Sequence, residues 1–166
     1  HGNPNFTISI AAEINDRLEA AIIYSPITDE MFTAERGKGS FLNDKRIRVA
    51  TRKKLSDSIL ITGIPHLGRG NKELFIKEMD MIIPEVAGIR RSGSAALDLA
   101  WIAAGRYDIF WERGLSIWDI AAGVLLVREA GGFAKGIDGS DKDLWNGNII
   151  SGNDDIIIAL SEKLGF

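Results

Sequence analysis

The first 50 residues alternate between apolar and polar side chains with a period of two, which is the pattern of half-buried β-strands. Turn-forming residues separate the apolar stretches at Asn15-Asp16, around Pro26 and Asp29, and at Asn43-Asp44. The stretches themselves predict strands over 6–14, 18–24, 31–34, 39–42 and 47–49. We therefore expect residues 1–50 to form part of the antiparallel sheet of an N-terminal subdomain, built as a meander of hairpins.

From Thr51 onward, short continuous apolar runs alternate with longer stretches of helical period. The pattern predicts strands over 59–62, 87–90, 107–111 and 148–151, and helices over 71–81, 94–104, 116–130 and 154–164. The segment 136–147 is rich in Asp and Gly and predicts a surface loop. Strands that alternate with helices are typical of an α/β layer, so residues 51–166 are expected to form a C-terminal α/β subdomain.

The composition is that of an ordinary globular domain, with 166 residues of which 45% are hydrophobic and 26% charged. No stretch approaches the roughly 20 apolar residues of a transmembrane helix, so we expect no membrane contact. The absence of Cys excludes disulfides and thiolate chemistry and favours the reducing cytoplasm. Because His1 and His66 are the only histidines, any metal is expected to be bound through oxygen, with Mg²⁺ the default.

The charge pattern makes nucleic acid an unlikely partner. The net charge is −3. One basic cluster lacks the interleaved aromatic residues on which bases would stack, and we interpret it as a solvated face. Its members are Lys45, Arg46, Arg48, Arg52, Lys53 and Lys54.

The segment 115–132 carries the most distinctive candidate for chemistry, Asp119. Ser116 precedes it by three residues, the spacing of a capping box, and capping alone would explain both side chains. The helix that follows is apolar nearly all round, with small residues at 121–123, so its first turn is expected to face the interior. A buried carboxylate is costly unless a cation or hydrogen-bond donors meet it, which makes Asp119 a candidate metal ligand. On the residues alone both interpretations stay open.

Two other segments offer binding groups. Gly93-Ser94-Ala95-Ala96 begins a predicted helix, where free backbone N–H groups can hold phosphate oxygens, although Ser94 is also an ordinary helix cap. Glu112 follows the strand 107–111, at the carboxyl end where α/β sheets bind ligands, and the alternative is a surface Glu in a tight loop. Other enzyme classes lack their motifs: there is no Gly-x-Gly-x-x-Gly loop, Walker A loop or Gly-x-Ser-x-Gly elbow, and His66 is expected in a loop.

The stretch Trp118-Asp119-Ile120-Ala121-Ala122-Gly123, followed by Glu129-Ala130-Gly131-Gly132, closely resembles the carboxyl-terminal signature of the inositol monophosphatase family. Matches elsewhere extend the resemblance over essentially the whole chain: Asn3-Pro4-Asn5-Phe6, Gly37-Lys38-Gly39-Ser40-Phe41-Leu42-Asn43, Gly93-Ser94-Ala95-Ala96-Leu97-Asp98-Leu99 and Ala104-Gly105-Arg106-Tyr107-Asp108. The resemblance implies the layered αβαβα sugar-phosphatase fold, of the α/β (α+β) class. We expect it here in incomplete form, as an antiparallel hairpin sheet followed by a mixed, mostly parallel sheet with flanking helices.

The resemblance also implies an activity and a set of roles. The activity is Mg²⁺-dependent, lithium-sensitive hydrolysis of a phosphate monoester, inositol monophosphate, by a cytoplasmic homodimer. Asp119 would be a catalytic metal ligand and Glu112 a contact to the hydroxyls of the substrate ring. Gly93, Ser94 and Ala95 would form a substrate-binding loop.

The sequence also departs from the family pattern. Members of the family carry an upstream Glu and an Asp-Pro-Ile-Asp-Gly-Thr motif, which supply most metal ligands and the Thr that helps to activate water, and neither is present here. We therefore expect the chain to be the carboxyl-terminal portion of a phosphatase, inactive alone, whose missing N-terminal segment covers one face of the hairpin sheet. Phe6, Ile8, Ile10 and Ile14 would then form an exposed apolar patch. Position 116 is Ser where some relatives have His, which leaves ring selectivity open.

Two alternative functions remain. One is another phosphatase of the same superfamily, acting on a different sugar phosphate or a nucleotide phosphate. The other is a non-catalytic role in which the fold binds a partner in a transcription complex.

Overall fold

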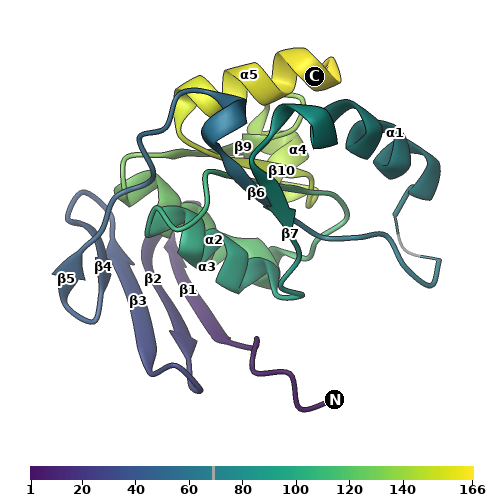
Figure 1. The fold of residues 1–166 in the computed structure, drawn as a ribbon. Helices are drawn as coiled ribbons and strands as arrows, with labels where there is room; N and C mark the ends of the chain where they lie inside the picture. The colour runs from purple at the N-terminus through teal and green to yellow at the C-terminus, as the bar shows by residue number, and fades with distance from the viewer. Residues whose placement is uncertain (69) are drawn as a thin grey trace.

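Two five-stranded sheets and the helices packed on them make up the part of the chain that the computed structural model describes, residues 1–68 and 70–166. In Figure 1 the helices α2 (Ala95–Ala103) and α3 (Ile117–Glu129) lie between the two sheets. The helices α1 (Lys72–Ile82) and α5 (Asp154–Leu164) lie on the far side of the second sheet. The layers therefore run sheet, helices, sheet, helices, which confirms the predicted α/β class. No helix within these described ranges has the length and apolar character needed to span a membrane.

The first sheet is antiparallel throughout, with the strand order β1-β2-β3-β4-β5. Its strands are β1 (Ile8–Ile14), β2 (Arg17–Ser25), β3 (Glu30–Glu35), β4 (Gly39–Leu42) and β5 (Lys45–Arg46). Both residues of the turns Asn15-Asp16 and Asn43-Asp44 have positive φ, as tight two-residue hairpins require. The predicted strand over 47–49 is wrong. The chain leaves the sheet there because the Val49 backbone N–H donates to the Ala130 carbonyl, 3.2 Å away, at the end of α3.

The second sheet has the strand order β7-β6-β8-β10-β9. Its strands are β6 (Ile59–Thr62), β7 (Gly88–Arg90), β8 (Ile109–Glu112), β9 (Phe133–Gly136) and β10 (Ile149–Gly152). Four strands run in one direction and β10 runs in the other, so the mixed, mostly parallel sheet is confirmed. Four elements outside the predicted ones are present: β9, a short helix α4 (Asp141–Trp145) inside the segment 136–147 that was expected to be a loop, and two single-turn 3-10 helices at Leu55–Asp57 and Ile83–Glu85.

The inner helices α2 and α3 pack very closely because one of them contributes a glycine at the contact. A Cβ on Gly123 of α3 would lie 2.4 Å from the Cβ of Leu99 in α2. All residues of α3 from 120 to 127 are buried, as expected from its apolar sequence, but its first turn is not interior: Ile117 and Trp118 are 52% and 71% exposed. The same core includes Ile23 and Phe32 of the first sheet, so residues 1–50 and 51–166 are joined by one core.

The first sheet presents an open apolar face on the side away from α3. Phe6, Ile8, Ile10 and Ile14 are 49%, 52%, 55% and 60% exposed. The strand register places Ile10 opposite Ile22, which is also exposed, whereas the next residue, Ile23, is fully buried. The apolar patch expected from the sequence is therefore present.

We expect residues 1–166 expressed alone to bind a hydrophobic dye and to self-associate, because a contiguous apolar face recruits other apolar surface. Dye fluorescence and sedimentation velocity measure the two effects. Replacing Ile8 and Ile10 by Thr keeps β-branched side chains in the strand but removes apolar area, so this variant should show weaker dye binding and less association. A monodisperse monomer that binds no dye would contradict the expectation.

Candidate active site

The candidate site lies where β6 and β8 end and where α2 and α3 begin. A cavity of about 360 Å³ opens there, and its walls include all five of the residues singled out from the sequence. These are Gly93, Ser94, Ala95, Glu112 and Asp119. Three segments that are separate in the sequence therefore meet at one cavity, as the position of Glu112 at a strand end had suggested.

Glu112 is the last residue of β8 and its carboxylate lies against Gly63, which follows β6. A Cβ at position 63 would fall 1.9 Å from Glu112 Oε1, so a side chain there would displace this carboxylate from its present position. Burial, and after it the nearby charge of Asp119, raise the pKa of Glu112 to about 7, against the opposing effects of Arg91 and the Gly63 backbone N–H. The carboxyl group is thus held close to its protonation midpoint at neutral pH.

Asp119 occupies the first turn of α3 and forms the predicted capping box. The Ser116 backbone N–H donates to Asp119 Oδ2 over 3.0 Å, and the Ser116 side chain accepts from the backbone at position 119. Oδ1 accepts no hydrogen bond from any residue in the described part of the chain. The cap therefore occupies one carboxylate oxygen of Asp119 and leaves the other available to a cation.

A complete metal site is not present in the described ranges. No group of three or more His, Asp or Glu side chains there has the arrangement needed to hold an ion. The donor chemistry of Asp119 suits Mg²⁺, which prefers carboxylate oxygen, but this side chain provides only one ligand.

The loop 92–95 leads into α2. Gly93 has φ of 97°, a left-handed conformation that favours glycine, and Ser94 caps the helix by accepting from the Leu97 backbone N–H at 3.4 Å. The ordinary capping interpretation of Ser94 is thus correct. Although Ser94 is a helix cap, the first turn of α2 still lies beside the cavity.

Asp98 on α2 also lines the cavity, although it was not predicted from the sequence; its carboxyl group is buried, and the residue is only 2% exposed. The Ser92 hydroxyl donates to Asp98, and the Ser94 backbone N–H donates to that hydroxyl over 3.0 Å, so Asp98 helps to fix the loop. Burial raises the pKa of Asp98 to about 7, and the Glu112 charge adds to this effect, whereas Ser92 and Arg91 oppose it. A single acidic residue in an otherwise apolar helix is the signal that could have revealed it.

His66 lies in a loop, as expected, and is exposed. It borders the cavity and also a neighbouring one of about 450 Å³, which extends from Glu112 toward Leu74 and Phe75 of α1. Glu112 therefore borders both cavities.

The model of the inositol monophosphatase family matches residues 1–165. The chain belongs to the inositol monophosphatase family. It is 54% identical over 164 residues to the inositol-1-monophosphatase of Rhizobium meliloti (strain 1021), a match that covers 99% of this chain and 62% of that protein.

Other members of the inositol monophosphatase family carry a second name. The chain is 48% identical to the Nus factor SuhB of Pseudomonas aeruginosa, covering 92% of this chain and 57% of that one. The crystal structure of extragenic suppressor protein suhB from Bartonella henselae aligns with a TM-score of 0.93 at 51% identity, covering 97% of this chain and 62% of the other. This chain therefore spans about three fifths of the length of these relatives.

The raised pKa values of Asp98 and Glu112 predict a loss of stability with rising pH. Both carboxyls stay protonated in the folded state up to about pH 7, whereas in the unfolded chain they ionise near pH 4. The folded state thus binds more protons in this window, and the free energy of unfolding falls as pH rises from 4 to 7. For each group the fall is on the order of 3 kcal/mol.

Asp98→Asn should remove the contribution of Asp98 and so roughly halve the slope of the free energy of unfolding against pH. Urea unfolding of the full-length protein at a series of pH values, in the presence of a chelator, measures it. Asp155→Asn, on the exposed side of α5, is the matched control and should leave the slope unchanged. An equal slope in wild type and Asp98→Asn would show that Asp98 is ionised in the folded state.

Proposed function

We propose that the full-length protein is a Mg²⁺-dependent phosphatase that hydrolyses inositol monophosphate. The observation that carries this proposal is the meeting of Gly93–Ala95, Glu112 and Asp119 at one cavity in a member of the inositol monophosphatase family. The cavity offers helix-start N–H groups for phosphate oxygens and carboxylates for a cation and for hydroxyl groups. These are the groups that a phosphate ester of a polyol requires.

In this proposal the residues have distinct tasks. Asp119 Oδ1 is a ligand for Mg²⁺, and Glu112 accepts hydrogen bonds from ring hydroxyls of the substrate. The 93–95 loop orients the ester, held in its conformation by Ser92 and Asp98. When bound, the metal would supply a water of lowered pKa and charge to stabilise the leaving oxygen.

We further propose that activity requires parts of the protein beyond these 166 residues. Asp119 alone does not make a metal site, and the relatives are longer than this chain. An N-terminal segment that covers the open sheet face and brings the other ligands would account for both observations. A homodimer, sensitivity to lithium and a cytoplasmic location remain part of the proposal from family resemblance.

A second candidate function is the non-catalytic binding role. It is favoured by the relatives named Nus factor SuhB, to which the chain is 45–48% identical. The two functions differ in their dependence on Asp119, because a binding surface elsewhere on the fold does not need a metal ligand in this cavity. Hydrolysis of a different sugar or nucleotide phosphate is the other alternative, and a substrate panel on the full-length protein distinguishes it.

Asp119→Asn in the full-length protein should lower turnover by roughly 100-fold or more and raise the Mg²⁺ concentration needed for half-activation, because a charged ligand is lost. Kinetics at varied Mg²⁺ measure both. Ser116→Ala is the control, since it removes the other half of the capping box: it should reduce stability by about 1 kcal/mol without changing half-activation. Similar Mg²⁺ dependence in wild type and Asp119→Asn would leave Asp119 with a capping role only.

Glu112→Gln should raise KM for inositol monophosphate about tenfold, because one charge-assisted hydrogen bond to a ring hydroxyl is weakened. For p-nitrophenyl phosphate, which has no ring hydroxyl, KM should change by less than about threefold. Steady-state kinetics with both substrates give the comparison. If both substrates lose kcat equally, Glu112 acts on the metal or the attacking water instead.

A further inference from the structure

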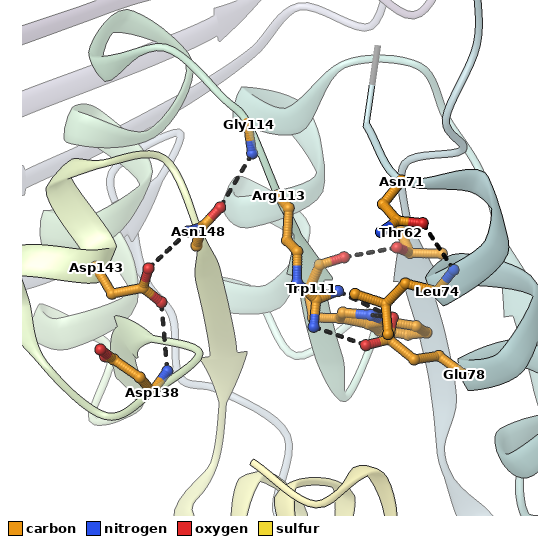
Figure 2. A network of polar contacts seen from close by, with 10 residues as sticks. All are labelled: Thr62, Asn71, Leu74, Glu78, Trp111, Arg113, Gly114, Asp138, Asp143 and Asn148. Carbon is orange, nitrogen blue, oxygen red and sulfur yellow. Dashed lines mark hydrogen bonds and ion pairs between the residues drawn. The ribbon is translucent and has the colours of Figure 1, made fainter. Parts of the chain in front are cut away.

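A buried carboxylate on α1 binds both neighbours of Glu112. Glu78 is 2% exposed, and its Oε2 accepts from Arg113 NH1 at 2.9 Å and from the Trp111 indole N–H at 3.4 Å. Its Oε1 accepts from Arg113 NH2 at 2.6 Å. Figure 2 shows Glu78 beneath the side chains of Trp111 and Arg113, with dashed lines to both. A single acidic side chain therefore anchors the end of β8 on either side of Glu112.

Because side chains alternate between the two faces of a strand, the contacts of Glu78 with Trp111 and Arg113 also affect the position of Glu112. Successive residues point to opposite faces, so Trp111 and Arg113 lie toward α1 while Glu112 lies toward Gly63 and the candidate site. With both neighbours bound to Glu78, the strand end cannot rotate, and Glu112 is kept on the cavity side. The Arg113 guanidinium is further restrained by the ring of Phe166, whose centroid is 5.1 Å away.

The turn that follows Glu112 is held from a second direction. The Gly114 backbone N–H donates to Asn148 Oδ1 at 3.3 Å, and Asn148 in turn donates to Asp143 at 2.6 Å (Figure 2). The Leu115 backbone N–H donates to the Gly147 carbonyl at 3.1 Å. These contacts hold the backbone that follows Arg113, while the Glu78 contacts with Trp111 and Arg113 restrain the strand end itself, so the segment that carries Glu112 is restrained from two directions.

We propose that Glu78 is a positioning residue that, through Arg113 and Trp111, holds Glu112 in the orientation needed to bind the hydroxyl groups of the substrate. The inference rests on the proposed function. Glu78 itself lies on the opposite face of the strand from the 360 Å³ cavity and is absent from its lining. Replacing Glu78 should therefore change the discrimination between substrates and leave metal binding and the activation of water unaffected.

Glu78→Gln and Arg113→Met in the full-length protein test the proposal. Each variant breaks the bidentate ion pair between Glu78 and Arg113 while keeping a side chain of similar size. We expect each to raise the ratio of KM for inositol monophosphate to KM for p-nitrophenyl phosphate about tenfold, the change expected for Glu112→Gln, because a small misplacement weakens an oriented hydrogen bond. The Mg²⁺ concentration for half-activation should stay the same. If Glu78→Gln does not fold, Arg113→Lys is the alternative variant. It keeps the positive charge but cannot bind the carboxylate with two nitrogens, so it should raise the KM ratio by a smaller factor.

The chain offers a matched control in the pair of Glu30 and Arg106. Arg106 also binds a glutamate with both terminal nitrogens and lies over an aromatic ring, Phe32, with 5.8 Å to the centroid. Neither Glu30 nor Arg106 lines the cavities beside Glu112. Glu30→Gln should lower the melting temperature yet leave the KM ratio unchanged. An unchanged ratio in Glu78→Gln and Arg113→Met, or an equal rise in Glu30→Gln, would overturn the positioning role.

A structural measurement separates this inference from the proposed function. If the wild-type protein hydrolyses neither substrate, the proposed function fails, and crystal structures of the variants then decide the role of Glu78. The Glu112 carboxylate should leave its contact with Gly63 in Glu78→Gln and keep it in Glu30→Gln. A carboxylate that stays on Gly63 in both variants would refute the inference whatever the activity.

Discussion

The close contact between α2 and α3 is the constraint on which the rest of the structure depends. These helices separate the two sheets, and their first turns carry the 93–95 loop and Asp119 to one cavity. Gly123 allows the approach, since any side chain there would overlap Leu99. The distance between the two helices thus fixes both the thickness of the inner layer and the spacing of the binding groups, so that packing in the core and geometry at the site cannot vary independently.

Burial of this layer also sets the electrostatics of the site. Burial is the main cause that raises the pKa of Asp98 and of Glu112 to about 7; the charge of Glu112 adds to the effect at Asp98, and the charge of Asp119 adds to it at Glu112. Without a cation these two carboxyl groups are close to half protonated at neutral pH. A cation on Asp119 would favour their ionised forms, so that metal binding and proton release are expected to be coupled. A site that is costly without its ligand is typical of functional centres.

The sequence predicted best those features that depend on neighbouring residues. The bounds of α5 and β6 were correct because Asn153 caps the helix and a short β-branched run forms the strand. The prediction of a strand at 47–49 was wrong because the Val49 backbone N–H donates to the carbonyl of Ala130, which is distant in the sequence. For the same reason Glu78 could not be found: its partners lie 33 and 35 residues further along, and an isolated Glu in a helix normally faces solvent.

The open sheet face and the incomplete metal site adjoin each other. Asn5, Phe6 and Thr7 line the candidate cavity. Just beyond them the Ser9 hydroxyl donates to the Trp118 carbonyl at 3.2 Å, one residue before Asp119. An element that packs on Phe6 would therefore border the cavity, whereas Ile8 and Ile10 lie on the face of the sheet opposite to Ser9 and α3. In the proposed function, a single covering segment that packs on the apolar face and reaches Phe6 would be enough to bring further ligands to the free oxygen of Asp119.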